Sequence, residues 1–103
     1  MTTRYIMTHE VIRQEEARLQ ERVRSYPANG RKTSTGTIKM IRKEISDMTF
    51  RIARKCNVSV NYPKWSIQGK KVVLGEPTIL LPTLRYVSFE ELKAIELSYE
   101  GGA

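Results

Sequence analysis

Residues that build disulfides, metal sites and catalytic centres are scarce in this sequence, which contains one cysteine, one histidine and one aspartate among 103 residues. A single cysteine excludes an internal disulfide framework and fits a reducing compartment. The lone histidine, His9, has no neighbour at metal-ligand or catalytic-triad spacing, so neither a metal site nor a cofactor is expected. The sequence therefore predicts a protein that is not an enzyme.

Long hydrophobic runs are also missing. The longest apolar runs, such as residues 72–74 and 79–81, are three residues each, whereas a membrane-spanning helix needs about 20. Residues 1–10 carry Arg4 but no apolar segment of the kind found in signal peptides. We therefore expect no membrane partner and a cytoplasmic location.

Acidic residues are scarce only in the middle of the chain. The net charge is +7, but residues 22–75 carry thirteen basic side chains against Glu44 and Asp47, which gives this stretch a net charge of +11. Residues 1–21 have a net charge of −1, and residues 76–103 have a net charge of −3. A field of one sign attracts polyanions. Nucleic acid is the first candidate, and an acidic protein surface is the second.

One helix is predicted clearly, at residues 37–56. Its apolar residues recur at alternating spacings of three and four, which places them on one stripe. At about 100° per residue, the opposite side carries Lys39, Lys43, Phe50 and Arg54. Cys56 continues the stripe as a small buried hydrophobe. The stripe consists of Ile38, Ile41, Ile45, Met48 and Ile52.

A first helix is predicted at about residues 9–25, with Thr8 as its N-cap. His9 is then a surface residue at the start of the helix. Two acidic residues, Glu15 and Glu16, interrupt the apolar stripe, which makes this helix only moderately amphipathic. It is expected to lie against the helix at 37–56. Its stripe consists of Ile12, Leu19, Val23 and Tyr26.

The connection between the two helices has the sequence GRKTSTG at residues 30–36. Its cations and hydroxyls lead into a helix N-terminus, which is a plausible cradle for phosphate. The alternative is a flexible polar link. The motif is not a Walker A loop, because Thr37 and not lysine follows the second glycine.

The second half of the chain has the period of two that is typical of strands. Residues 58–62 alternate, and residues 65–74 predict a β-hairpin with Gly69 in its turn. Further short strands are predicted at 78–81 and 83–87. The prolines at 63, 77 and 82 keep the strands short and indicate edges.

A capping box predicts the start of the last helix. The Ser88 side chain can accept from the Glu91 amide, while the Glu91 side chain reaches back to the Ser88 amide. Val87 and Leu92 are placed as a hydrophobic staple. Together the segments predict a single α+β domain at residues 1–103: an antiparallel two-helix hairpin, a small antiparallel β-hairpin or meander, and a short C-terminal helix.

The basic middle of the chain predicts a nucleic-acid-binding protein that contacts DNA or RNA phosphates through the central helix and the hairpin. Three aromatic residues, Phe50, Tyr62 and Trp65, lie among the cations, and aromatic rings can stack on unpaired bases. The residues expected to contact nucleic acid are Arg31, Lys32, Lys39, Arg42, Lys43, Arg51, Arg54, Lys64, Trp65, Lys70 and Lys71.

A protein-interaction module is the alternative. The isoleucine-rich seam of the central helix also suits an interface, including that of a homodimer or a larger complex. A small, charge-polarised protein without catalytic residues further suits an inhibitor or adaptor, such as a phage or mobile-element product, that docks on an acidic protein surface.

Overall fold

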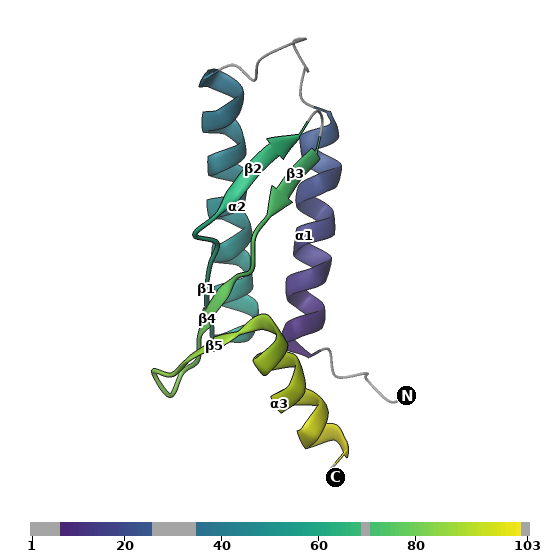
Figure 1. Cartoon of the computed structure of the whole chain (residues 1–103), viewed down its shortest axis with the longest axis vertical. Helices are drawn as coiled ribbons and strands as arrows, with labels where there is room; N and C mark the ends of the chain where they lie inside the picture. The colour runs from purple at the N-terminus through teal and green to yellow at the C-terminus, as the bar shows by residue number, and fades with distance from the viewer. Residues whose placement is uncertain (1–6, 26–34, 69–70, 102–103) are drawn as a thin grey trace.

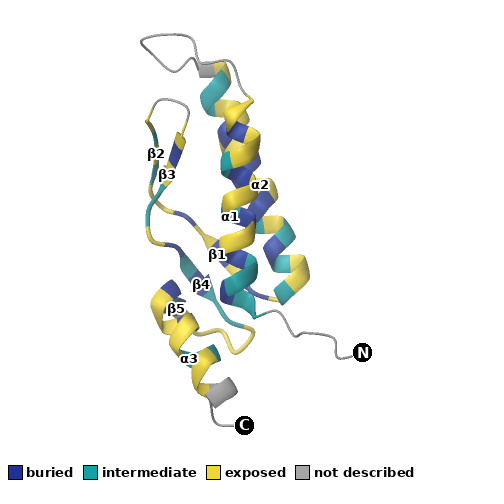
Figure 2. Cartoon of the chain, turned by 90° about the vertical axis from the view of Figure 1, so that its right-hand side faces the viewer, coloured by how far each residue is buried: buried dark blue, intermediate teal, exposed yellow. Residues whose placement is uncertain are grey.

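Two long antiparallel helices form one layer of the protein, and a β-ribbon with a third helix forms the other (Figures 1 and 2). The computed structural model describes residues 7–25, 35–68 and 71–101. This architecture confirms the α+β fold predicted from the sequence. The elements in chain order are α1 (Thr8–Arg24), α2 (Thr35–Cys56), β1 (Ser59–Asn61), β2 (Trp65–Gln68), β3 (Lys71–Leu74), β4 (Thr78–Leu80), β5 (Tyr86–Ser88) and α3 (Phe89–Gly101).

The predicted apolar stripes of α1 and α2 form the centre of the core. On α1, Ile12 and Leu19 are buried, and on α2 the side chains of Met48 and Ile52 are fully inaccessible. Cys56 is half-buried against this core, and burial raises the pKa of its thiol. The helix seam is therefore confirmed from Ile41 to Ile52, whereas Ile38, the first residue of the predicted α2 stripe, is only half-buried and lies outside the core cluster. Tyr26, the last residue of the predicted α1 stripe, lies outside the described residues.

The strands form two small antiparallel sheets that follow one another along one β-ribbon, which agrees with the predicted hairpin arrangement. β1 pairs with β4 and β2 pairs with β3, both antiparallel. Val60 faces Ile79 in the first ladder, and Ser66 faces Val73 in the second. Ser66 follows Val60 by six residues and Val73 precedes Ile79 by six, so the two ladders share one register. β5 adds to the far edge of β4 and gives the strand order β1-β4-β5. The predicted hairpin at residues 65–74 is present, although its turn at Gly69 lies outside the described residues.

Two prolines divide this ribbon. Pro63 and Pro77 have no N–H group to donate to a ladder. Between the two ladders, the Gly75 amide donates to the Lys64 carbonyl over 2.8 Å. A side chain at Gly75 would place its Cβ 3.0 Å from this same oxygen, so a larger residue would require the two segments to move slightly apart.

A glutamine side chain of α1 binds the backbone of β3 with the pair of hydrogen bonds that a neighbouring strand would make. The Gln20 amide group donates to the Val72 carbonyl and accepts from the Val72 amide, the second bond over 3.1 Å. The outer edge of β3 is thereby paired at this residue. The side chain of Val72 is fully buried under the ribbon.

The capping box at the start of α3 is present in part. The Glu91 amide donates to Ser88 Oγ over 3.1 Å, as predicted. The Glu91 carboxylate, however, lies 3.5 Å from the Ser88 hydroxyl rather than on its backbone amide. The residues of the predicted staple, Val87 and Leu92, are both buried.

The start of α1 differs from the prediction. The N-cap is Met7, which makes no side-chain capping bond, so the assignment of Thr8 as the cap is wrong. Instead, the Glu96 carboxylate of α3 accepts from the Thr8 and His9 amides over 2.7 and 2.8 Å. It also lies 3.0 Å from His9 Nδ1. His9 is consequently buried, and its prediction as a surface residue is wrong.

Removal of this carboxylate tests how much it stabilises the fold. Glu96→Ala leaves two amides at the positive end of α1 without their acceptor. We expect the free energy of unfolding, measured in urea, to fall by about 1–3 kcal/mol. Glu76→Ala, which removes an exposed glutamate outside the helices, should change it by less than about 0.5 kcal/mol. Equal effects of the two substitutions would contradict the capping role of Glu96.

Candidate functional site

The cations of α2 fall into two groups according to the direction that they face. On the side of α1, Arg51 Nε lies 2.9 Å from Glu15 Oε2, and Lys55 Nζ lies 3.0 Å from Glu15 Oε1. A second link between the helices joins Arg22 to both oxygens of Glu44, over 2.7 and 3.0 Å. These charges bind the helices to each other.

Glu15 has an unusual environment for an acidic residue, because only 4% of its side chain is exposed. Burial alone would raise the pKa of its carboxyl group, but the bonds from Lys55 and Arg51 outweigh burial and lower this pKa below its ordinary value. The sequence suggested that Glu15 interrupts the apolar stripe of α1. The structure instead places its ionised carboxylate inside the interface between α1 and α2.

The outward side of α2 carries cations without such partners. Lys39, Arg42, Lys43 and Arg54 are exposed. Within the part of the chain that the structure describes, no carboxylate lies at ion-pairing distance from these four. Phe50 lies on the same side with 64% of its surface exposed. We call these five residues the basic face.

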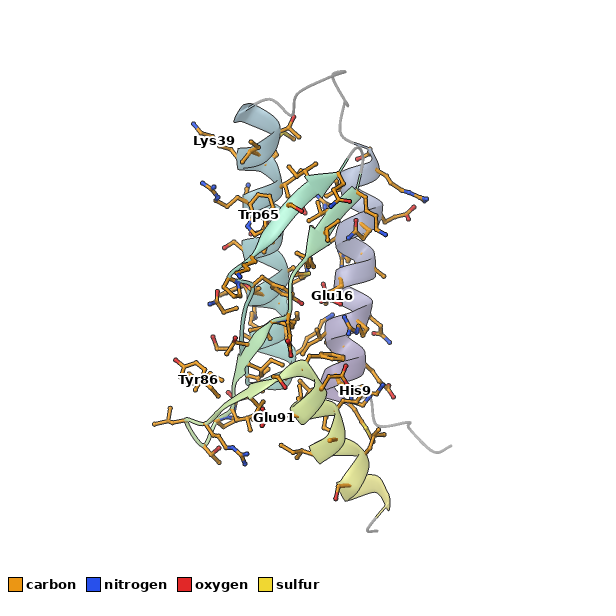
Figure 3. The ribbon with its side chains drawn as sticks, in the orientation of Figure 1. His9, Glu16, Lys39, Trp65, Tyr86 and Glu91 are labelled. Carbon is orange, nitrogen blue, oxygen red and sulfur yellow. The ribbon has the colours of Figure 1, made fainter. Side chains whose placement is uncertain are left out.

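The basic face follows α2 over most of its length. Lys39 and Arg54 are fifteen residues apart, which corresponds to about 22 Å along the helix axis. Lys39 lies near the first turns of α2, at the end of the molecule opposite to α3 (Figure 3). The Arg54 guanidinium lies 5.9 Å from the centre of the Phe50 ring. Exposed Asp47 is the one carboxylate on the outward side of α2.

The other predicted site residues differ in how accessible they are. Lys64 and Lys71 are exposed on the ribbon. Arg51 is engaged with Glu15 and is only partly exposed. Trp65 is half-buried and packs against the hydrophobic core. Three predicted residues lie outside the described part of the chain: Arg31, Lys32 and Lys70. Residues 30–34 of the predicted phosphate cradle lie outside it as well.

Of the three aromatic residues expected among the cations, only Phe50 is freely accessible. Tyr62 is buried, and its hydroxyl donates to Glu16 over 2.6 Å. Burial and this bond both raise the pKa of the Tyr62 hydroxyl far above its ordinary value. Trp65 presents only part of its surface.

A hollow on the surface lies elsewhere, between α1 and β3. This open groove has a volume of about 690 Å³ and includes residues of both charges. Its two cations, Arg13 and Lys71, lie among three carboxylates. The Arg13 guanidinium is already engaged, 2.7 Å from Glu16 and 3.8 Å from the centre of the Phe89 ring. The groove therefore has no net preference for an anion comparable with that of the basic face.

Comparison with protein-family models, curated proteins and solved structures found no match for this chain. Within residues 7–25, 35–68 and 71–101, no cluster of three or more histidine, cysteine, aspartate or glutamate side chains is suited to hold a metal ion. None of the helices in these ranges is long and apolar enough to cross a membrane.

The ionised state of Glu15 predicts a pH dependence of stability. Its pKa is lower in the folded protein than the ordinary value of 4.5, so the unfolded chain binds the proton more tightly. The stability contributed by this group should be present above pH 4.5 and lost as the pH falls through the folded pKa. Glu15→Gln should destabilise the protein at neutral pH by about 1–3 kcal/mol.

Urea unfolding from about pH 7 down to pH 3 measures both effects. Stability should fall less steeply with acid in Glu15→Gln than in the wild type. Glu21→Gln is the matched control, because its exposed carboxylate only approaches Arg24 at 3.8 Å. Parallel curves for the wild type and Glu15→Gln would show that folding does not lower the pKa of Glu15.

Proposed function

We propose that this protein is a small, non-catalytic nucleic-acid-binding protein that holds phosphates of DNA or RNA on the basic face of α2. The main observation is the contrast between its two groups of cations. Arg51 and Lys55 share a buried carboxylate, whereas the cations of the basic face are exposed and have no such partner among the residues that the structure describes. Charges of this second kind neutralise phosphates and release counterions.

The start of α2 lacks the acidic side chains that a helix dipole favours. Its first turn has no acidic residue, and the dipole acts mainly within that turn. Lys39, Arg42 and Lys43 follow in the second and third turns. A polyanion bound to them would supply the negative charge that this end of the helix lacks.

The rest of the charge distribution supports the same orientation. Lys64 and Lys71 extend the positive charge onto the ribbon. Acidic residues gather at the opposite end, where α3 begins with Phe89, Glu90 and Glu91. Glu91 and Lys39 lie far apart along the molecule in Figure 3. A polyanion is therefore directed to α2 and away from α3. An intracellular location agrees with this function.

Charge reversal on the basic face tests the proposal. In the triple variant Lys39→Glu, Lys43→Glu and Arg54→Glu, the affinity for random oligonucleotides should fall at least about tenfold at low salt. The slope of log K against log salt should become shallower by roughly 2–3 units, since each phosphate contact contributes about 0.7–0.9. Fluorescence anisotropy at several salt concentrations measures both quantities.

Two control variants separate the basic face from total charge and from stability. Arg18→Glu, Arg24→Glu and Lys93→Glu together change the net charge equally but lie outside α2, so binding should persist. Ser88→Ala removes the acceptor of the Glu91 amide and should cost about 0.5–2 kcal/mol of stability. It should nevertheless bind with near-normal affinity where it is folded. Loss of binding in both triple variants alike would remove the special role of α2.

A protein partner with an acidic surface is the second candidate, and a separate observation favours it. Leu84, in the turn between β4 and β5, is 80% exposed and adopts a positive φ of 64°, and Tyr86 at the start of β5 is 68% exposed. Exposed aromatic and aliphatic side chains of this kind are typical of protein interfaces. Absence of oligonucleotide binding by the wild type at low salt would decide in favour of this candidate.

A further inference from the structure

An exposed aromatic ring in the middle of the basic face carries an inference about which form of nucleic acid binds there. Phe50 contributes little to the hydrophobic core, because 64% of its surface is accessible. Phenylalanine is also a weak helix former compared with the lysine or glutamate that would serve at an exposed position. Neither the core nor the helix accounts for an aromatic residue at this position.

The chemistry of the ring indicates what it meets. Phenylalanine has no hydrogen-bonding group, so it gains nothing from contact with the phosphates on the outside of a duplex. The edges of paired bases are read mainly by polar side chains. An unpaired base, in contrast, offers a flat face on which a phenyl ring can stack.

The neighbours of Phe50 complete such a site. Arg54 follows one helical turn later and places its guanidinium 5.9 Å from the ring centre. Lys43 precedes Phe50 by seven residues, about 10 Å along the axis. The ring therefore lies between two exposed cations along one helix face, which is the combination of stacking platform and phosphate contacts that single-strand-binding proteins use.

We propose that the basic face binds single-stranded nucleic acid, with an unpaired base stacked on Phe50 and the adjoining phosphates on Lys43 and Arg54. This inference rests on the proposed function and narrows its ligand from nucleic acid in general to unpaired strands. Tyr62 and Trp65 do not share the role, since Tyr62 is buried and Trp65 packs against the core.

Substitution of Phe50 tests the inference, with three probes of equal length and random sequence: single-stranded DNA, single-stranded RNA and duplex DNA. Stacking of one base contributes about 1–3 kcal/mol, so Phe50→Ala should weaken binding to at least one of the single strands by roughly 5- to 150-fold. Duplex affinity should change by less than about twofold. Phe50→Trp, which keeps an aromatic ring at this position, should bind single strands about as well as the wild type.

Tyr86→Ala is the matched control, because it also removes an exposed aromatic ring but on β5, beside Glu91 and away from Lys39 (Figure 3). It should bind single strands as the wild type does. A single-stranded probe that contains 2-aminopurine reports stacking directly. Its fluorescence should be quenched by the wild type and by Phe50→Trp, but not by Phe50→Ala.

The outcomes separate this inference from the proposed function. If the triple charge reversal abolishes binding while Phe50→Ala binds single strands normally, the nucleic-acid function stands and the stacking role is overturned. A wild-type preference for duplex over both single strands also overturns it. If the wild type binds none of the probes at low salt, both proposals fail. Unfolding curves for the Phe50 variants should match the wild type, because the ring is outside the core.

Discussion

The buried carboxylate of Glu15 determines how charge is arranged on the two helices. An ion inside an interface requires an opposite charge, and α2 supplies both Arg51 and Lys55. The reciprocal link from Arg22 to Glu44 strengthens the same interface. Because these contacts use Arg51 and Lys55, the cations of α2 that are not paired with a carboxylate of the described residues lie on its outward side. One interface thus stabilises the fold and delimits the candidate site.

Most of the fold could be predicted from local patterns, because each pattern reflects an energetic requirement of its own element. The periodicity of Met48 and Ile52 identifies the buried side of α2. Turn-forming residues and prolines mark the positions at which the strands end. The shared register of the ribbon could not be predicted in this way, since it depends on residues such as Val60 and Ile79 meeting across nineteen positions. The contact of Glu96 with His9 is more distant still and has no local signal.

The site was predictable to the extent that a helix fixes directions. The spacing of Lys39, Lys43 and Arg54 places them opposite the apolar stripe whatever else the chain does. The pairing of Arg51 depends on which flank of α2 receives α1, and periodicity does not specify the flank. Trp65 illustrates the same difficulty in a strand, where alternation separates two faces but does not show which of them the helices cover.

The contact between Glu96 and the start of α1 joins residues 88 positions apart in the chain. Closing so long a segment costs conformational entropy before any contact offsets it. The first turn of α1 therefore obtains its hydrogen-bond acceptor only when α3 has docked. We expect the start of α1 and the docking of α3 to form in the same cooperative step. A fragment that stops before α3 loses more than that helix, because the first amides of α1 also lose their hydrogen-bond acceptor.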